Sequence, residues 1–587
     1  MSTSKTVCDA FQQIVKVEPD AVAMRTPGDT VSITWREYDE RVRKIAAGLD
    51  RLGLKRGDTL AFMLVNRPEF ALVDTAGMHL GATCFSVYNT SSPEQLNYLF
   101  SHAENKIVVT EKAFLDRILK CGVSIEHVIC IDGPADGATG TLADLESGDP
   151  RDGFDFDAAW QAVQPEDVCT LIYTSGTTGP PKGVQTTHAN IVAEVTLIKP
   201  IAPIHFGDRQ TSFLPAAHIA DRVSTLYFMA FYGIQVTYID DPKGVLPALL
   251  DCRPTVWFAV PRVWEKIRAG IEAKVNAEPD EAKRKIALDS IAVGRLKARS
   301  VTGGEPLTAE QQEQWELAEA FVLGNLRAAI GLDQCRYAWT GAAALAPDTL
   351  EFFIGLGIKL CELWGMSETT GIATINPPEA IRVGSVGIAV PGVEVKLAED
   401  GEIMVRGPIN MAGYRKDPEK TAETLNAEGW ILTGDIGVLD DEGYFKIVDR
   451  KKELIINAGG KNMSPTNIEN SVKAACPLIG GIIAIGDNRA YNVALIALDP
   501  DAAAMYAERV GISPDPAVLA KDAGVLAIVA KGVEDGNTKL SRVEQIKKFE
   551  LLSTFWEPGG TELTPTMKLR RKPINEKYSA EIEALYA

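Results

Sequence analysis

The sequence predicts a layered α/β protein with a large N-terminal domain and a small, mobile α+β C-terminal domain. Two observations lead to this expectation. Short apolar strands alternate with amphipathic helices through the first two thirds of the chain, a pattern typical of sheets covered by helices. After Pro391 the chain changes to short alternating strands with tight turns. At 587 residues it also exceeds the length that one hydrophobic core usually organises.

The alternation of helices and strands begins near the N-terminus. Residues 35–52 place apolar side chains three and four positions apart, which predicts an amphipathic helix. These side chains are Tyr38, Val42, Ile45, Leu49 and Leu52. The apolar segments TLAFMLV (59–65) and VCTLIY (168–173) predict buried strands. The uncharged run 223–239 is shorter than the roughly 20 residues of a membrane-spanning helix, so we expect it in the core.

The last third of the chain predicts smaller units. We expect an N-terminal domain over residues 1–448, with 390–448 as a β-rich subdomain whose turns lie at Gly401 and Gly443. Residues 453–587 are expected to form the C-terminal domain, with an extra helical pair around 500–550. Its end places Ile574, Tyr578, Ile582 and Leu585 at helical spacing.

Composition limits the functional classes. The net charge of -19 repels polyanions and argues against a general nucleic-acid binder. Nine cysteines without a C-x-x-C pair predict scattered free thiols, not a disulfide framework or a zinc site. The start lacks the features of an export signal, so we expect a cytoplasmic protein. Peripheral contact with a membrane, and a monomeric or homodimeric state, are left open.

The strongest chemical signal is YTSGTTGPPKGV (173–184), which follows a predicted strand. Glycines, hydroxyls and a lysine in such a loop can surround phosphates, because the backbone can approach closely and its N–H groups can donate. Gly183 follows Lys182 where the Walker loop requires Ser or Thr. A kinase or ATPase of the P-loop type, which would release ADP, is therefore disfavoured.

This loop resembles the signature loop of the adenylate-forming superfamily, which includes acyl-CoA synthetases, luciferases and the adenylation domains of peptide synthetases. Further motifs that resemble those of the superfamily follow in the same order. They are ELWGMSETTG (362–371), LTGDIG (432–437), DRKKELIINAGGKNMSP (449–465) and LTPTMKLRRK (563–572). The resemblance covers nearly the whole chain and implies the luciferase-like fold, with ATP, Mg²⁺ and coenzyme A as the small molecules bound.

The resemblance implies a nucleotide site built from several motifs. Thr174 and Glu368 would lie at the metal and take part in catalysis, and Asp435 and Arg450 would hold the ribose. A flat ring at Trp364 could stack on a purine, and small residues at 341–343 would allow close approach. The residues implied for nucleotide and coenzyme A are Thr174, Ser175, Gly176, Thr177, Thr178, Gly179, Lys182, Gly341, Ala342, Ala343, Glu362, Leu363, Trp364, Gly365, Met366, Ser367, Asp435, Arg450, Lys452, Gly459, Gly460 and Lys461.

The C-terminal motifs resemble the moving parts of the superfamily. Lys568 resembles the catalytic lysine that bridges the acid and the α-phosphate, although most relatives have glycine where Met567 stands. Lys452 falls at the hinge, 449–452, about which the C-terminal domain would rotate between two half-reactions. Rotation would then bring Gly459, Gly460 and Lys461 to the thiol channel.

LPAAHIADR (214–222) resembles the segment at the acyl pocket, where His218 would lie near the substrate carboxylate. Some long-chain relatives have a gating Trp four residues beyond this histidine, but this chain has Arg222.

The sequences of these motifs most resemble those of long-chain fatty acyl-CoA synthetases. The resemblance predicts that ATP, a fatty acid and coenzyme A give acyl-CoA, AMP and diphosphate. Three alternatives are a fatty acyl-AMP ligase that loads a carrier protein, a CoA ligase for another hydrophobic acid, and an inactive homologue that acts as a sensor. The sequence does not determine the acyl chain length or the pathway.

Overall fold

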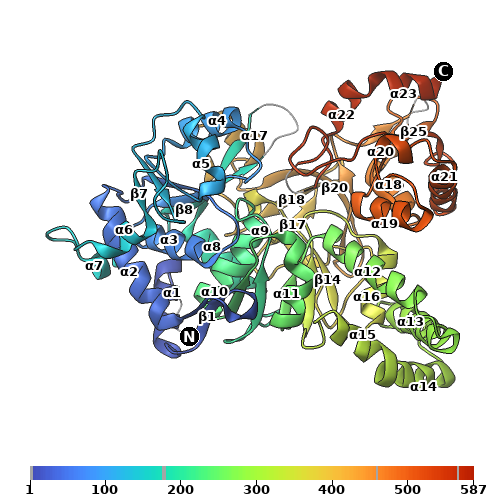
Figure 1. Ribbon diagram of the computed structural model, residues 1–587, viewed down its shortest axis with the longest axis horizontal. Coiled ribbons are helices and arrows are strands. Elements are labelled where there is room, and N and C mark those ends of the chain that lie inside the picture. The colour runs from blue at the N-terminus through green and yellow to red at the C-terminus, as the bar shows by residue number, and fades with distance from the viewer. Residues whose placement is uncertain (1–3, 175–179, 458–460, 565–566) are drawn as a thin grey trace.

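The largest sheet of the protein forms the N-terminal layer. A computed structural model describes residues 4–174, 180–457, 461–564 and 567–587 (Figure 1). Eight strands lie in the order β19 (Gly413–Tyr414), β9 (Lys182–Thr187), β8 (Val168–Thr174), β4 (Thr83–Ser86), β3 (Thr59–Met63), β5 (Ile107–Thr110), β6 (His127–Cys130) and β7 (Gly140–Thr141). From β8 to β7 the pairs are parallel, whereas β9 and β19 add an antiparallel edge.

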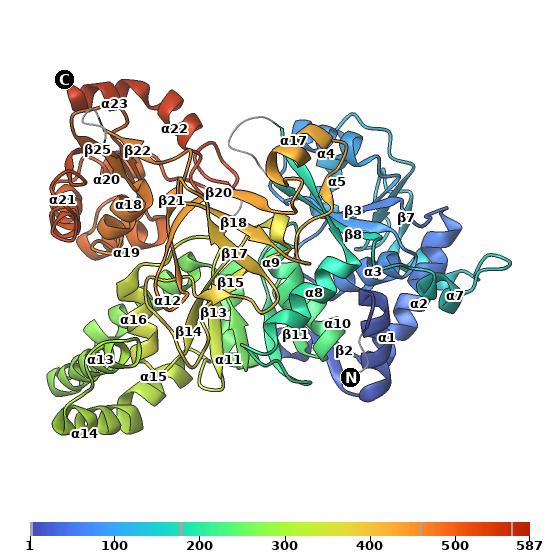
Figure 2. The ribbon, with the colours of Figure 1, turned by 180° about the vertical axis from the view of Figure 1, so that it is seen from behind.

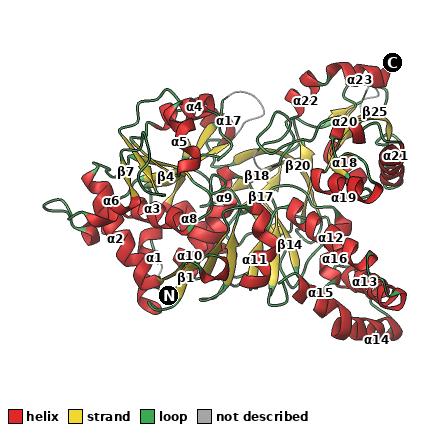
Figure 3. Cartoon of the chain, viewed as in Figure 1, coloured by secondary structure: helices red, strands yellow, loops and turns green. Residues whose placement is uncertain are grey.

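Two further sheets complete the large domain. A five-stranded sheet has the order β12 (Val256–Phe258), β13 (Tyr337–Thr340), β14 (Leu360–Trp364), β15 (Thr374–Ile375) and β16 (Ile388–Ala389). A four-stranded sheet has the order β10 (Arg209–Ser212), β11 (Gln235–Tyr238), β1 (Val22–Arg25) and β2 (Ser32–Thr34). The predicted layered α/β architecture is confirmed (Figure 3).

Helices cover these sheets. They are α1 (Val7–Val17), α2 (Trp35–Arg51), α3 (Pro68–His79), α4 (Pro93–Ala103), α5 (Lys112–Leu119), α6 (Leu142–Ser147), α7 (Phe156–Gln161), α8 (His188–Ile198), α9 (Ile219–Asp221), α10 (Phe228–Tyr232), α11 (Val245–Cys252), α12 (Pro261–Asn276), α13 (Glu281–Val301), α14 (Ala309–Ala318), α15 (Gly324–Ala329), α16 (Pro347–Gly355) and α17 (Pro418–Thr424). The π-helical turns η2 (Arg222–Tyr227) and η4 (Glu319–Leu323) join neighbouring helices, and η1 (Pro27–Asp29), η3 (Pro242–Gly244) and η5 (Ser367–Thr369) are 3-10 turns.

The predicted helix over 35–52 is confirmed as α2. Thr34 caps it, because its hydroxyl accepts from the Glu37 N–H while the Glu37 carboxylate accepts from the Thr34 N–H. The predicted apolar side chains of this helix from Tyr38 to Leu49 are buried.

The predicted β-rich region also forms. Its antiparallel sheet has the order β17 (Glu394–Leu397), β18 (Glu402–Arg406), β20 (Ile431–Leu439) and β21 (Phe445–Arg450). Gly401 and Gly443 lie in its turns with φ of 83° and 87°, a conformation that side-chain-bearing residues rarely adopt.

The C-terminal region has hydrophobic clusters of its own. One apolar cluster contains buried residues from Val7 to Ile431, whereas two others contain only residues from Ile455 onward. Its strands are β22 (Ile455–Ile456), β23 (Asn462–Met463), β24 (Ile479–Ile485), β25 (Asn492–Leu498) and β26 (Ile546–Leu551). Its helices are α18 (Pro465–Lys473), α19 (Pro500–Val510), α20 (Pro516–Leu519), α21 (Ala523–Asn537), α22 (Arg571–Lys577) and α23 (Ser579–Tyr586) (Figure 2). The hinge at 449–452 stays a prediction.

Ion pairs join the C-terminal region to the large domain. On α12, Arg262 pairs with Asp499, Lys266 with Asp501 at 2.6 Å, and Glu265 with Lys473 at 2.9 Å. Asp348 at the start of α16 pairs with Lys539 at 2.7 Å. These pairs are made in the orientation in which the site described below is assembled.

The apolar run 223–239 passes through the interior, as predicted. Within the described ranges, none of the helices combines the length and apolar character needed to span a bilayer. All nine cysteines are free thiols, and all but Cys335 are buried, which confirms the expectation from their spacing.

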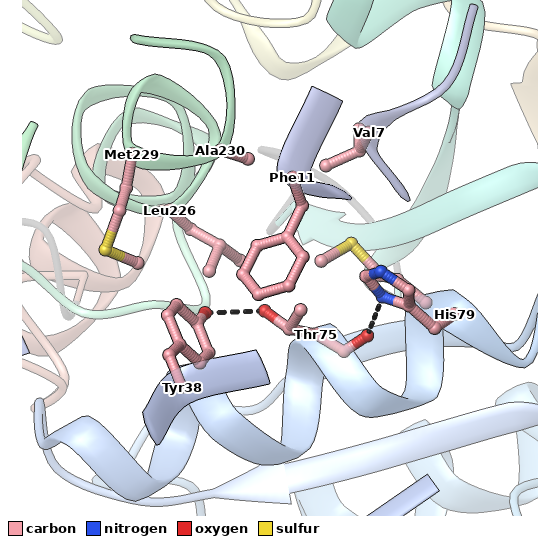
Figure 4. Close-up of a pocket in the computed structure, with 9 residues that line it drawn as sticks. Val7, Phe11, Tyr38, Thr75, His79, Leu226, Met229 and Ala230 are labelled. Carbon is pink, nitrogen blue, oxygen red and sulfur yellow. Dashed lines mark hydrogen bonds between the residues drawn. The ribbon is translucent and has the colours of Figure 1, made fainter. Parts of the chain in front are cut away.

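A buried histidine, His79, packs in the core beneath α1. Figure 4 shows Phe11 between Tyr38 and His79, with the hydroxyl of Tyr38 and the Nδ1 of His79 both bonded to Thr75 at 2.7 Å. His79 has no exposed surface, and burial lowers its pKa to about 4.

His79 therefore predicts a loss of stability in acid. An unfolded histidine titrates near pH 6.5, so between that pH and 4 the unfolded chain binds more protons than the folded one. We expect the free energy of unfolding to lose up to about 3 kcal/mol through this window as pH falls. In His79→Gln the loss should disappear, so the stability difference between wild type and variant, followed by urea unfolding, should shrink from pH 7 to pH 4. A difference independent of pH would contradict the assignment.

Candidate active site

The predicted phosphate loop joins two paired strands. β8 ends at Thr174 and β9 begins at Lys182, and the sheet register places these two residues opposite each other. Because of this pairing, the hydroxyl of Thr174 and the side chain of Lys182 come from neighbouring positions of one sheet and could contact the same ligand. Ser175, Gly176, Thr177, Thr178 and Gly179 lie outside the described residues.

The segment 362–371 forms strand β14 and the turn η5. Glu362 is buried on β14, where burial raises its pKa to about 8. A Cβ on Gly365 would lie 2.0 Å from the carbonyl oxygen of Gly371, so only glycine fits. A Cβ on Gly341 would lie 2.5 Å from Leu363 Cδ1 on the next strand. The segments 341–343 and 362–371 therefore lie side by side, as the strand order requires.

Ala342, Ala343, Met366 and Ser367 complete these two segments. Ala342 has φ of 68°, a conformation rare outside glycine, and Ala343 is exposed. Met366 and Ser367 open the turn η5, where Ser367 is buried and Met366 half-buried.

A tyrosine connects two of the predicted site residues. Tyr414 Oη donates to Glu368 Oε1 at 2.6 Å and accepts from Lys182 Nζ at 3.1 Å. The sequence interpretation missed Tyr414. Its only signal was a glycine-tyrosine pair that forms strand β19, which pairs with β9.

Asp435 organises a second part of the site. Trp364 Nε1 donates to Asp435 Oδ2 at 2.8 Å, and Arg450 Nε lies 2.8 Å from Asp435 Oδ1. The pairing of β20 with β21 places Arg450 opposite Asp435. The structure therefore brings together three predicted residues, although it buries most of Trp364, and the stacking role of this ring stays a prediction.

Lys568 lies in a tight turn, in which Lys568 N–H donates to Thr564 Oγ1 and Thr564 N–H to the carbonyl of Lys568. Met567 has φ of 65°, the left-handed region that favours glycine. The side chain of Lys568 is exposed, yet the surrounding protein lowers its pKa, and the positive charge of Arg450 acts in the same direction. The charges of Asp435, Glu368 and Glu453 oppose this shift. Lys568 is therefore within electrostatic reach of Arg450, Asp435, Glu368 and Glu453.

His218 begins the helix formed by α9, η2 and α10. Its Nδ1 accepts from the Ala220 N–H at 3.1 Å, so in the neutral ring the proton lies on Nε2. Burial, together with the positive charge of Lys568, lowers the pKa of His218 to about 3. His218 is thus a neutral hydrogen-bond donor on the side of the site that Lys568 faces.

Family comparison agrees with this assembly. Residues 11–415 match the model of the AMP-binding enzyme family, and residues 452–587 match the model of the AMP-binding enzyme C-terminal domain. The chain belongs to the AMP-binding enzyme family.

Two relatives and one solved structure illustrate the range of this family. The chain is 53% identical to the protein named fatty-acid–CoA ligase fadD11 of Mycobacterium tuberculosis over 77% of this chain and 79% of that protein. It is 34% identical to long-chain-fatty-acid–CoA ligase FadD15 of the same organism over 97% and 95%. The crystal structure of the anthranilate CoA ligase AuaEII with anthranoyl-AMP has a TM-score of 0.73 at 18% identity, covering 98% of each chain, and supports the fold alone.

The remaining C-terminal residues predicted for this AMP-binding enzyme follow β21 in sequence. Lys452 is exposed two residues beyond β21, and Lys461 is exposed at the start of the segment that leads into β23. Gly459 and Gly460 lie outside the described residues. The roles of Lys452 and Lys461 stay predictions.

Arg222 lies in the core. Its side chain is fully buried and pairs with the fully buried Asp74 of α3 at 2.7 Å, while its Nε donates to the carbonyl of Ala216. The sequence offered no signal for this partner, since Asp74 is 148 positions away.

Proposed function

We propose that the protein is a long-chain fatty acid–CoA ligase that converts ATP, a fatty acid and coenzyme A into acyl-CoA, AMP and diphosphate. The observation that carries the proposal is that Lys568, from the C-terminal region, is close enough to Arg450, Asp435, Glu368 and His218 for their charges and its own to act on one another. The names of relatives that align over most of the chain support the fatty acid as substrate.

The nucleotide would lie across the ends of β8 and β14 and the middle of β20. Thr174, the loop up to Gly179, and Lys182 would bind the phosphates, and Asp435 with Arg450 would bind the ribose hydroxyls through charge-assisted hydrogen bonds. The segments 341–343 and 362–367 would line the base, because the glycine at 341 lets the first segment approach Leu363 of the second.

Magnesium fits the groups present at Glu368 and Thr174. The carboxylate of Glu368 is only 6% exposed and is held by Tyr414, and a carboxylate and a hydroxyl are the oxygen ligands that Mg²⁺ prefers. Bound there with ATP, Mg²⁺ would neutralise part of the phosphate charge.

The first half-reaction joins two anions. A carboxylate oxygen of the acid attacks the α-phosphorus, the bond to the bridging oxygen of the β-phosphate breaks, and diphosphate leaves. His218 Nε2–H would orient the carboxylate, and the ammonium of Lys568 would stabilise the negative charge that builds between acid and α-phosphate.

The second half-reaction needs a different arrangement of the same chain. The sulfur of coenzyme A attacks the carbonyl carbon of the acyl-adenylate, the bond from that carbon to AMP breaks, and the thiol proton is released. Rotation about Lys452 would withdraw Lys568 and present Gly459, Gly460 and Lys461 to the thiol. The four ion pairs on α12 and α16 would break in that rotation.

A panel of acids from acetate to C20, with aromatic acids included, tests the substrate and the acceptor. With Mg·ATP and coenzyme A, we expect AMP and thioester to form with long-chain acids and not with acetate or benzoate. Diphosphate without a thioester would favour a carrier protein as acceptor, and turnover of short or aromatic acids alone would contradict the fatty acid assignment.

A further inference from the structure

Tyr414 stands between two charged groups that the proposed function assigns to Mg·ATP. Its hydroxyl donates to Glu368 Oε1 at 2.6 Å and accepts from Lys182 Nζ at 3.1 Å, and the Lys182 ammonium lies 4.2 Å from the centre of its ring. Tyr414 is 4% exposed and Glu368 6%. The hydroxyl of Tyr414 therefore links the Lys182 ammonium to the Glu368 carboxylate in one hydrogen-bonded row.

The backbone fixes this row from both ends. Met411 N–H donates to the carbonyl of Glu368, and Arg415 N–H donates to the carbonyl of Gly183, both at 2.8 Å. The segment from Met411 to Arg415 thus spans from the turn that carries Glu368 to the strand that begins at Lys182. Tyr414 lies inside that span.

Helix α17 supports the segment from its other side. Tyr414 N–H donates to Thr421 Oγ1 at 2.9 Å, and a Cβ on Gly413 would lie 3.0 Å from Thr421 Cγ2. Gly413 has φ of 139°, which favours glycine. The ring therefore has little freedom to turn away from Glu368.

The hydroxyl has a single O–H and can donate it to one acceptor only. An ammonium has no lone pair to accept with, so the contact with Lys182 is one in which the hydroxyl accepts, and its O–H is directed to Glu368.

From this geometry we infer that Tyr414 is a positioning residue, which orients the Glu368 carboxylate for the metal of Mg·ATP. The inference rests on the proposed function. Because the phenol holds Oε1, Oε2 is left to bind the metal. The hydrogen bond also restricts rotation of the carboxylate before the metal binds, so less rotational freedom is lost on binding. When Lys182 binds the phosphates of ATP, the hydrogen bond from Tyr414 to Glu368 remains.

Binding of ATP to Tyr414→Phe, measured by isothermal titration calorimetry without acid or coenzyme A, tests the inference. We expect about tenfold weaker binding of Mg·ATP, the scale usual for a lost partner of a metal ligand, and no change in the binding of ATP in EDTA. Thermal unfolding should remain cooperative, since the ring is retained, with the modest loss expected when a buried carboxylate loses one donor.

Two further variants make the test specific. Tyr98→Phe removes a hydroxyl that donates to the carbonyl of Pro181, near the same loop but away from Glu368, and should bind Mg·ATP like wild type. In Glu368→Gln, the added Tyr414→Phe change should have no further effect on Mg·ATP binding.

Three outcomes would overturn the inference. These are unchanged Mg·ATP binding by Tyr414→Phe, an equal loss with and without Mg²⁺, and an undiminished loss in the Glu368→Gln background. Failure of the wild-type protein to bind Mg·ATP would instead contradict the proposed function, so the two failures are distinguishable.

Discussion

Replacement of Lys568 by alanine is expected to slow formation of the acyl-adenylate by about 10²–10³-fold. The reason is electrostatic, because the ammonium lies within electrostatic reach of Glu368, Asp435 and His218, and one preorganised donor to a developing anion contributes on this scale. Thioester formation from supplied acyl-adenylate should change only a fewfold, because Lys568 would be withdrawn in that step.

Single-turnover measurements of the two half-reactions check this prediction. Lys572→Ala is the matched control, since Lys572 is also an exposed lysine of the same basic run but pairs with Glu576 at 3.9 Å on its own helix. It should leave both half-reactions near wild type. An equal loss of both half-reactions in Lys568→Ala would contradict a specific role in adenylation.

The largest expected effect on stability comes from Arg222. Arg222→Met should lower the free energy of unfolding by about 3–5 kcal/mol, because it leaves Asp74 in the core without its cationic partner. The double variant Arg222→Met with Asp74→Leu should recover most of the loss, since apolar side chains of similar volume can replace a buried pair.

Urea unfolding of the two single variants and the double variant measures this coupling. Asp221 provides a control, because it lies beside Arg222 in sequence but its carboxylate accepts from the hydroxyls of Ser212 and Thr225 instead. Asp221→Asn should not be rescued by Asp74→Leu. Two results would contradict a stabilising role of the pair. One is a free energy of unfolding of Arg222→Met equal to that of wild type, and the other is a loss in the double variant equal to the sum of the two single losses.

Local patterns in the sequence were sufficient where structure depends on neighbours along the chain. The periodicity of residues 35–52 gave α2, and Gly401 and Gly443 marked turns that need positive φ. The spacing of Ile574, Tyr578, Ile582 and Leu585 predicted buried helical positions, although the chain forms two helices that meet at Tyr578.

Contacts between distant residues could not be predicted in this way. Trp364 and Asp435 are 71 positions apart, and Tyr414 and Glu368 are 46 apart. Strand order brings them together, and no periodicity encodes strand order. The motifs indicated which residue types the site needs, but the bond from Tyr414 to Glu368 and the burial of Arg222 depend on the packing of separate sheets.

Oxygen transfer tests most directly the central claim that the acid is activated as an acyl-adenylate. A long-chain fatty acid labelled with ¹⁸O in both carboxylate oxygens is turned over with Mg·ATP and coenzyme A, and the products are examined by mass spectrometry. The account predicts AMP that carries one labelled oxygen, with unlabelled diphosphate. ADP with labelled inorganic phosphate, which would mean attack at the γ-phosphorus, would contradict it.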